Sequence, residues 1–305
     1  MRLLRARLDA EAGDDRSNQQ PITTLLATLK APAFLPALRQ LAPRLSPSST
    51  IVLLHNGLGV REELIRELWP DAAKRPTLVQ GITSAGVRTV EPFDVRLEGR
   101  GAWTFATVPA AGNPSEPTSL QATTGLLTTL ARAPGSLVTP RVVPFLELQQ
   151  AAYLKMAVNV AINPLTALFG VPNGELAGEA FGPLLDLLVG ETSTVLRAMK
   201  DADGRPLLAA TAFSAKTLKA AILDVALNTA GNRSSMLQDV DAGRPTEVDY
   251  ISGHLSGIAT STGKNAPLNA LLRQKVASLG TPDAVARPLT AAGLLREFES
   301  SSRCS

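Results

Sequence analysis

The sequence predicts an α/β layer followed by an all-α domain. Between about residue 22 and residue 110, short apolar runs alternate with segments of helical periodicity, which is typical of βαβ units. From about Val143 onward, long segments of helical periodicity are broken by Pro and Gly. The stretch 133–144 has the composition of a connection between domains. We therefore expect two domains, residues 1–142 and residues 143–305.

The first half should contain buried strands separated by short helices. Short apolar runs predict strands at residues 23–29, 50–55 and 77–87. Apolar residues at helical spacing predict helices at residues 34–45 and 61–68. The stretch 95–109 is expected to supply strands at an edge of the sheet. Because helices connect the buried strands, the sheet should be parallel.

The second half should bury one apolar stripe from each of several helices, which is the pattern of an all-α domain. The expected helices are residues 146–162, 182–199, 213–230, 246–261 and 267–279.

Composition gives no support for two classes of partner. The chain has 305 residues, of which 45% are hydrophobic and 19% charged, with a net charge of +3, so it should bury a large core. Lys and Arg are scattered rather than clustered, which gives no support for nucleic acid as a partner. No apolar stretch approaches the roughly 18 residues of a membrane-spanning helix. We therefore expect neither nucleic acid nor a membrane as a partner.

Cysteine and histidine are too few for disulfides or a zinc site. Cys304 is the only cysteine, so an internal disulfide is impossible and a reducing compartment is expected. His55 and His254 are the only histidines, too few to hold zinc without cysteines. Counting residues leaves carboxylate sites for harder ions open, and we expect no metal.

The first residues, MRLLRARLDAEAGDD, favour a cytoplasmic location over a mitochondrial one. Arginines at positions 2, 5 and 7 are typical of a mitochondrial presequence, but four acidic residues follow at once, and transit peptides avoid them. Leucine and alanine alternate with the arginines, which predicts a short strand at residues 2–8. A mitochondrial location is kept as the alternative.

Three polar side chains repeat every four residues in the otherwise apolar segment 153–176. Lys155, Asn159 and Asn163 would lie on one face of a helix. A buried amine or amide destabilises a fold unless it is paired, so three in register indicate a polar pocket that binds a ligand. Hydrogen bonds between helices are the alternative, and on these residues alone they are the more frequent outcome.

A second polar constellation lies further along the chain. Ser235 and Asp239 are one helical turn apart, and Thr246 is placed to cap a new helix that has Glu247 in its first turn. A carboxylate there complements the helix dipole, which is the structural explanation. The functional alternative is that Glu247 faces Lys155, so that a carboxylate orients a buried proton donor.

Two glycine motifs carry less information. HNGLG (55–59) places two glycines after an expected strand, where backbone amides can approach a ligand, and a plain tight turn is the alternative. GIATSTGK (257–264) resembles a phosphate loop, but it has one residue too many between its glycines and follows a helix rather than a strand. We therefore discount it.

Two segments closely resemble the signatures of ketopantoate reductases, the 2-dehydropantoate 2-reductases. They are YLKMAVNVAINPLTALFGVPNGEL (153–176) and SSMLQDVDAGRPTEVDYISG (234–253), and the resemblance extends from about residue 21 to about residue 279. It implies an N-terminal Rossmann domain that binds NADPH and a helical C-terminal domain like that of 6-phosphogluconate dehydrogenases. The implied activity is NADPH-dependent reduction of ketopantoate to pantoate, on the route to pantothenate and coenzyme A.

The resemblance also implies a role for each polar residue of the two segments. Lys155 would be the general acid that protonates the substrate carbonyl oxygen, and Glu247 would bind substrate and support the lysine. Asn159, Asn163 and Ser235 match residues that hold the hydroxyl and the carboxylate of this small-molecule substrate.

Two residues of the first domain match family positions as well. Lys30 and Asn56 correspond to positions that line the cofactor and the junction between the domains. Helical C-terminal domains of this superfamily commonly dimerise, so the resemblance makes a homodimer an open alternative to a monomer.

The sequence departs from the family pattern in the cofactor half. The family opens with a strand that runs into G-x-G-x-x-G, whose turn holds the pyrophosphate at a helix N-terminus. That motif does not occur in this sequence, which predicts a truncated Rossmann-like sheet without its first βαβ unit. Ala85 stands where relatives often carry histidine. Two alternatives follow: a non-catalytic relative that keeps the helical domain as a ligand-binding or interaction module, and a reductase of another 2-keto acid.

Overall fold

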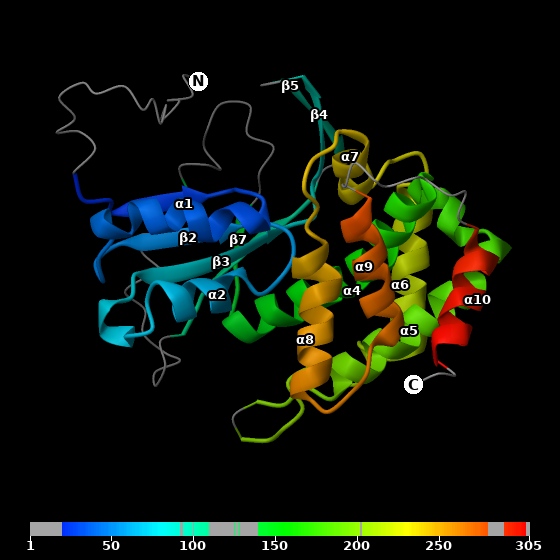
Figure 1. Ribbon diagram of the computed structural model, residues 1–305. Helices are drawn as coiled ribbons and strands as arrows, with labels where there is room; N and C mark the ends of the chain where they lie inside the picture. The colour runs from blue at the N-terminus through cyan, green and yellow to red at the C-terminus, as the bar shows by residue number, and fades with distance from the viewer. Residues whose placement is uncertain are drawn as a thin grey trace.

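The computed structural model describes residues 20–91, 94–99, 101–109, 125, 128, 140–201, 203–279 and 290–302. A five-stranded sheet lies beside a bundle of helices (Figure 1). The expected strand at residues 2–8 and the single cysteine lie outside the described residues.

The sheet is parallel where the sequence predicts buried strands and mixed beyond them. Its strands, in spatial order, are β1 (Thr24–Ala27), β2 (Thr50–Leu54), β3 (Thr77–Thr83), β6 (Trp103–Thr107) and β7 (Pro140–Val142). β1, β2 and β3 are parallel, β6 runs antiparallel to β3, and β7 is parallel to β6. The carboxyl ends of β1, β2 and β3 therefore meet at one edge of the sheet.

The stretch expected at the sheet edge, residues 95–109, supplies strands in two different places, β5 (Asp94–Gly99) and β6. β4 (Gly86–Glu91) and β5 form a separate antiparallel hairpin, which stands away from the sheet near helix α7 (Figure 1). β6 is not at the edge, because it lies between β3 and β7. The chain leaves the sheet after β3, forms the hairpin, and returns antiparallel beside β3.

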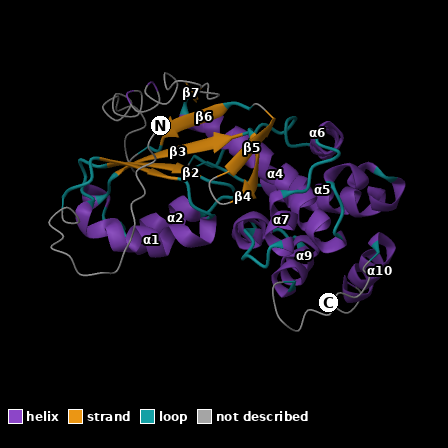
Figure 2. Ribbon diagram, turned by 90° about the horizontal axis from the view of Figure 1, so that it is seen from above, coloured by secondary structure: helices purple, strands orange, loops and turns teal. Residues whose placement is uncertain are grey.

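Two short helices cover one face of the sheet (Figure 2). They are α1 (Phe34–Leu41) and α2 (Val60–Glu67). The buried side chains of Phe34 and Leu64 pack in one core with Ile51 and Leu53 of β2. Burial of this apolar area fixes α1 and α2 on the sheet, because each helix presents a single apolar stripe.

The second domain is helical, as the sequence predicts. Its helices are α4 (Phe145–Phe169), α5 (Gly182–Arg197), α6 (Ala215–Asn228), α7 (Ser235–Asp241), the π-helical turn η7 (Asp249–Gly253), α8 (His254–Ser261), α9 (Pro267–Ser278) and α10 (Ala291–Ser302). Short 3₁₀ turns occur at η2 (Ala31–Ala33), η3 (Ala42–Arg44), η4 (Ala72–Lys74), η5 (Asn173–Ala177) and η6 (Glu179–Phe181).

Helix α4 lies at the centre of this domain. By length and composition it could cross a membrane, because it has 25 residues and contains an 18-residue window with a mean hydropathy of 1.2. The expectation that no apolar stretch approaches such a length is therefore wrong, and α4 is the one such helix in the described part of the chain. In the fold, 67% of its most apolar window is buried, and Val160 and Leu165 are fully enclosed by the other helices.

One predicted helix start is wrong. The helical segment that carries Tyr250 and His254 begins at Asp249 with Val248 as its N-cap, and no side chain caps it, so Thr246 is not the N-cap. The carboxylate of Glu247 instead reaches into the other domain, where it accepts a hydrogen bond from the backbone N–H of Ala31. A long-range partner has replaced the local one that the sequence suggested.

Candidate functional site

The polar face of α4 opens into a cleft of about 850 Å³ between the two domains. Lys155, Asn159 and Asn163 all line it, as their four-residue spacing on the helix requires. The opposite side of the cleft is formed by Asn56 after β2 and by Thr83 at the end of β3. The cleft thus lies at the carboxyl ends of parallel strands, where ligands bind in open α/β sheets.

Lys155 is held across the domain junction by two acceptors. Its Nζ donates to Asn56 Oδ1 at 2.8 Å and to the backbone carbonyl of Thr83 at 2.6 Å. Burial lowers the pKa of Lys155 to about 8, and the negative charge of Glu247 opposes that fall. The amine can therefore exchange a proton near neutral pH, which an exposed lysine cannot do readily.

Ser235 faces the same cleft from the start of α7. The preceding residue, Ser234, caps α7 by accepting from the backbone N–H of Leu237 at 3.1 Å. The Ser234 hydroxyl also lies 2.7 Å from Thr166 Oγ1 on α4. This buried contact fixes the first turn of α7 against α4 and places Ser235 beside the asparagines.

Glu247 and Lys30 lie together but not in the wall of the cleft. Lys30 Nζ is 2.7 Å from Asp239 Oδ2 and 3.9 Å from Glu247 Oε2. Glu247 is 4% exposed, and burial raises its pKa although the hydrogen bond from Ala31 and the charge of Lys30 act to lower it. The predicted pairing of Glu247 with Lys155 is through space, because the direct ion-pair partner of this carboxylate is Lys30.

The structure brings together five of the seven predicted site residues in the cleft and the other two in this adjoining charged cluster. Sequence reasoning missed Thr83, Asn173 and Arg233, which also line the cleft. Thr83 contributes a backbone carbonyl, which has no sequence signature. Asn173 lies within the first resembling segment, and Arg233 directly precedes the second. Neither residue belongs to a spacing pattern that would predict a place in the site.

The charged side chains that line the cleft are both basic. Lys155 and Arg233 are its charged side chains, and no Asp or Glu occurs among the described residues that line it. Arg233 is in turn ion-paired with Asp241. Such a lining favours an anionic ligand. No group of three or more His, Cys, Asp or Glu suited to a metal ion occurs in the described ranges.

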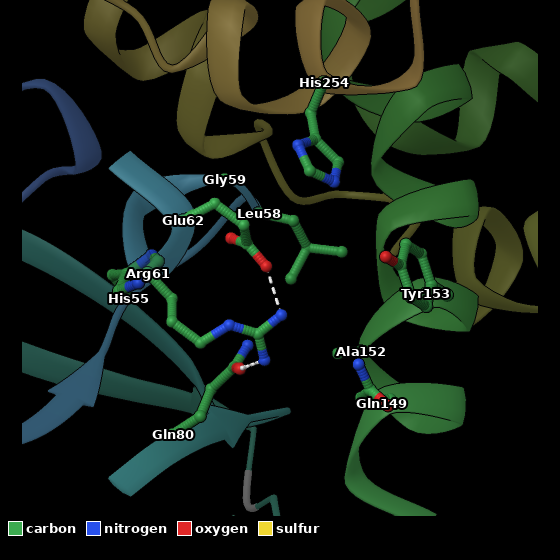
Figure 3. Close-up of a pocket in the computed structure, with 10 residues that line it drawn as sticks. All are labelled: His55, Leu58, Gly59, Arg61, Glu62, Gln80, Gln149, Ala152, Tyr153 and His254. Carbon is green, nitrogen blue, oxygen red and sulfur yellow. Dashed lines mark hydrogen bonds and ion pairs between the residues drawn. The ribbon is translucent and has the colours of Figure 1, made fainter. Parts of the chain in front are cut away.

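A second, much smaller pocket lies at the same junction (Figure 3). In it, Tyr153 of α4 and His254 of α8 face Arg61 and Glu62 of α2. Tyr153 and Lys155 are two residues apart on α4, so they project from different sides of that helix. The central helix therefore contacts the first domain on two sides, with the cleft on one of them.

Comparison with known proteins gives the family. The family described as "Ketopantoate reductase PanE/ApbA" matches residues 4–110, and "Ketopantoate reductase PanE/ApbA C terminal" matches residues 147–279. The 2-dehydropantoate 2-reductase of Vibrio cholerae is 30% identical over 292 residues, which cover 89% of this chain and 84% of that protein. The chain belongs to the ketopantoate reductase family. The enzyme of the same name from Salmonella typhimurium is 33% identical over 83% of this chain and 72% of its own length.

Solved structures confirm the expected fold class, a Rossmann-like sheet followed by a helical domain. A PanE/ApbA family ketopantoate reductase from Ralstonia eutropha superposes with a TM-score of 0.65 at 22% identity, covering 87% of this chain and 78% of that one. D-mandelate dehydrogenase in its ternary complex with NADH and anilino(oxo)acetate gives 0.67 at 19% identity, covering 86% and 77%. At these identities the likeness shows the fold alone.

The lowered pKa of Lys155 predicts a pH-dependent stability. The unfolded chain should hold the Lys155 proton up to about pH 10.5, whereas the folded chain releases it near pH 8. The unfolded state therefore binds more protons between these values, and the free energy of unfolding should rise with pH there. Urea unfolding at pH 8 and pH 10 should show a rise that is greater by about 2 kcal/mol in the native chain than in Lys155→Met. An equal rise of the unfolding free energy in both proteins would contradict a lowered pKa at Lys155.

Proposed function

We propose that this member of the ketopantoate reductase family reduces 2-dehydropantoate to pantoate with NADPH, and that Lys155 is the general acid. One observation carries the proposal: a mostly buried amine, with its pKa lowered to about 8, lies among asparagine side chains in a cleft whose described lining has no acidic residue. That setting suits an anionic substrate with a carbonyl group.

The chemistry follows from where charge develops. When hydride adds to the carbonyl carbon, negative charge grows on the carbonyl oxygen. A positioned ammonium stabilises this charge and then transfers its proton to the oxygen. Asn56 and the carbonyl of Thr83 hold Lys155 Nζ at the cleft, which limits the directions in which the proton can be donated. The product is a hydroxyl group and a neutral amine, which is reprotonated from solvent.

The remaining cleft residues would bind the substrate rather than transfer protons. Asn159 and Asn163 offer amide donors one and two turns along α4 from the lysine, and Ser235 offers a hydroxyl from α7. We assign these three residues to the carboxylate and hydroxyl groups of the substrate. Amides and hydroxyls can satisfy such groups without adding charge to the site.

Glu247 would act on Lys155 at a distance. Its charge raises the pKa of the lysine, against the larger effect of burial. A carboxylate at this place therefore keeps more of the amine protonated at neutral pH, as a general acid requires. The hydrogen bond from Ala31 and the nearby charge of Lys30 hold Glu247 in position.

We assign the nicotinamide end of NADPH to the carboxyl ends of β1, β2 and β3. Lys30 and Asn56 follow β1 and β2, and Ser84 follows β3, at the strand ends where a dinucleotide lies in this fold. Bound there, the cofactor supplies the hydride. No G-x-G-x-x-G motif occurs in the sequence, so we assign no residue to the pyrophosphate. The lone cysteine remains the basis for expecting a cytoplasmic enzyme, and the homodimer remains an expectation from the family.

Removal of the proposed acid should abolish most of the activity. In Lys155→Ala, kcat for ketopantoate should fall by about 10²- to 10⁴-fold, which is the usual contribution of general acid catalysis. In the native protein, kcat/KM for reduction should fall as the pH rises through about 8, because the lysine then loses its proton. Lys219→Ala, which removes a surface lysine paired with Asp186, is the control and should retain activity. Full activity in Lys155→Ala would exclude its role as the acid.

Cofactor binding separates an enzyme from a non-catalytic relative. Titration of the purified protein with NADPH, followed by nicotinamide fluorescence, should give a dissociation constant in the micromolar range, within the usual span for substrates of enzymes. NADH, titrated in parallel, tests the preference between the two cofactors. If neither NADPH nor NADH binds to the folded protein, a ligand-binding module is favoured instead.

A second candidate function is reduction of another 2-keto acid by the same residues. One observation favours it: Ala85 leaves a small side chain in the cleft wall. A panel of 2-keto acids with different substituents at the third carbon tests it. Ketopantoate should have the highest kcat/KM if the first proposal holds. A bulkier or unhydroxylated acid with a kcat/KM at least tenfold higher would replace it as the substrate.

A further inference from the structure

The NGLG turn is pressed against the helical domain at two glycines. Gly57 and Gly59 have φ angles of +79° and +101°, which residues with a Cβ atom rarely adopt. A Cβ on Gly57 would lie 2.8 Å from the Cβ and the carbonyl oxygen of Tyr250, and one on Gly59 would lie 2.9 Å from His254 Nδ1. The turn needs glycine for its backbone angles and for this contact.

Tyr250 ties the turn to the second domain through both its backbone and its side chain. Its carbonyl accepts from the backbone N–H of Leu58 at 2.9 Å, inside the turn. Its hydroxyl donates to Glu63 Oε2 on α2 at 2.9 Å. Its ring packs against the apolar core between α1, α2 and the sheet. A residue of the helical domain is thus anchored in the first domain at three points.

His254 closes the other end of the contact (Figure 3). Its ring projects from α8 towards Leu58 and Gly59 and lies with Tyr153 in a stacked arrangement, with ring centroids 6.5 Å apart. Burial lowers the pKa of His254, so the ring stays neutral at physiological pH and adds no charge to the junction. The turn is therefore held between Tyr250 on one side and His254 on the other.

The contact of the NGLG turn with Tyr250 positions two residues around Lys155, which are Asn56 and Glu247. Asn56 directly precedes Gly57, and its Oδ1 accepts from Lys155 Nζ. Glu247 lies three residues before Tyr250, whose backbone N–H donates to the Glu247 carbonyl at 3.0 Å. A shift of the turn relative to Tyr250 would move Asn56 relative to Glu247 and would admit water to the amine between them.

We propose that Tyr250, acting through the NGLG turn, is a positioning residue for Lys155: it keeps the junction closed, and with it the amine buried and aimed into the cleft. This inference rests on the proposed function for its catalytic meaning, but the placement of the lysine can be measured without substrate or cofactor. Tyr250 itself touches neither the cleft nor the reacting atoms.

The test compares two glycine variants with nearly equal backbone strain. Gly57→Ala introduces a methyl group into the contact with Tyr250, whereas Gly204→Ala, at φ +77°, introduces one with nothing within 4 Å. Lysines are reductively ¹³C-methylated and titrated by NMR, and the Lys155 signal is assigned by its loss in Lys155→Arg. The pKa of Lys155 should rise from about 8 by about one unit or more in Gly57→Ala, because opening the junction reverses the burial that lowers it. It should not change in Gly204→Ala.

A second set of variants applies if Gly57→Ala does not fold. Tyr250→Phe keeps the ring but loses the hydrogen bond to Glu63, and Glu63→Ala loses the same bond from the other side. Each should raise the pKa of Lys155 and lower kcat for keto-acid reduction by about fivefold, the usual effect of one hydrogen bond. Glu63→Gln retains an acceptor and should restore the native values. A tyrosine that only stabilised the fold would change the melting temperature without moving this pKa.

The outcomes distinguish the inference from the proposed function. A Lys155 pKa of about 8 in all of these variants would overturn the positioning role, whatever the activity. A raised Lys155 pKa in Gly57→Ala would support the positioning role even if the native protein reduced no 2-keto acid. Such inactivity of the native protein would overturn the proposed function alone.

Discussion

The contact of Lys155 with Asn56 and with the carbonyl of Thr83 is the interaction on which the rest of the site depends. It joins the central helix of one domain to the ends of two strands in the other. An amine placed there is taken out of water, which lowers its pKa, and it is held by neutral acceptors that leave it free to release its proton. This pair of hydrogen bonds thus joins the two domains at the buried amine that we propose as the proton donor.

Two basic side chains around this contact line the cleft, whereas the nearby carboxylates lie outside its wall. The cleft itself is lined by amides, hydroxyls and two cations among its described residues, which suits an anion. The carboxylates of Glu247 and Asp239 lie behind it and are paired with Lys30. Glu247 can therefore raise the pKa of Lys155 without standing in the cleft wall, where its charge would repel an anionic substrate. The same segment carries Tyr250, so the electrostatic and the mechanical support of the lysine come from one stretch of the second domain.

Much of this arrangement could be predicted from the sequence, because it is local. The four-residue spacing of Lys155, Asn159 and Asn163 requires a shared helix face, and apolar periodicity locates α1, α2 and the helices of the second domain. What could not be predicted depends on pairing over long distances. The antiparallel return of β6, the separate β4–β5 hairpin, and the backbone carbonyl of Thr83 leave no local pattern. The N-cap expected at Thr246 is wrong, and the neighbouring Glu247 accepts a hydrogen bond from Ala31, which lies far away in sequence.

The measurement that tests the central claim most directly is a crystal structure of the protein with NADP⁺ and pantoate. If Lys155 donates the proton, its Nζ should lie within about 2.6–3.2 Å of the hydroxyl oxygen on the second carbon of pantoate, with Asn56 still beside the amine. Pantoate bound in the cleft with that hydroxyl turned away from Lys155, and another acid in contact with it, would contradict the account.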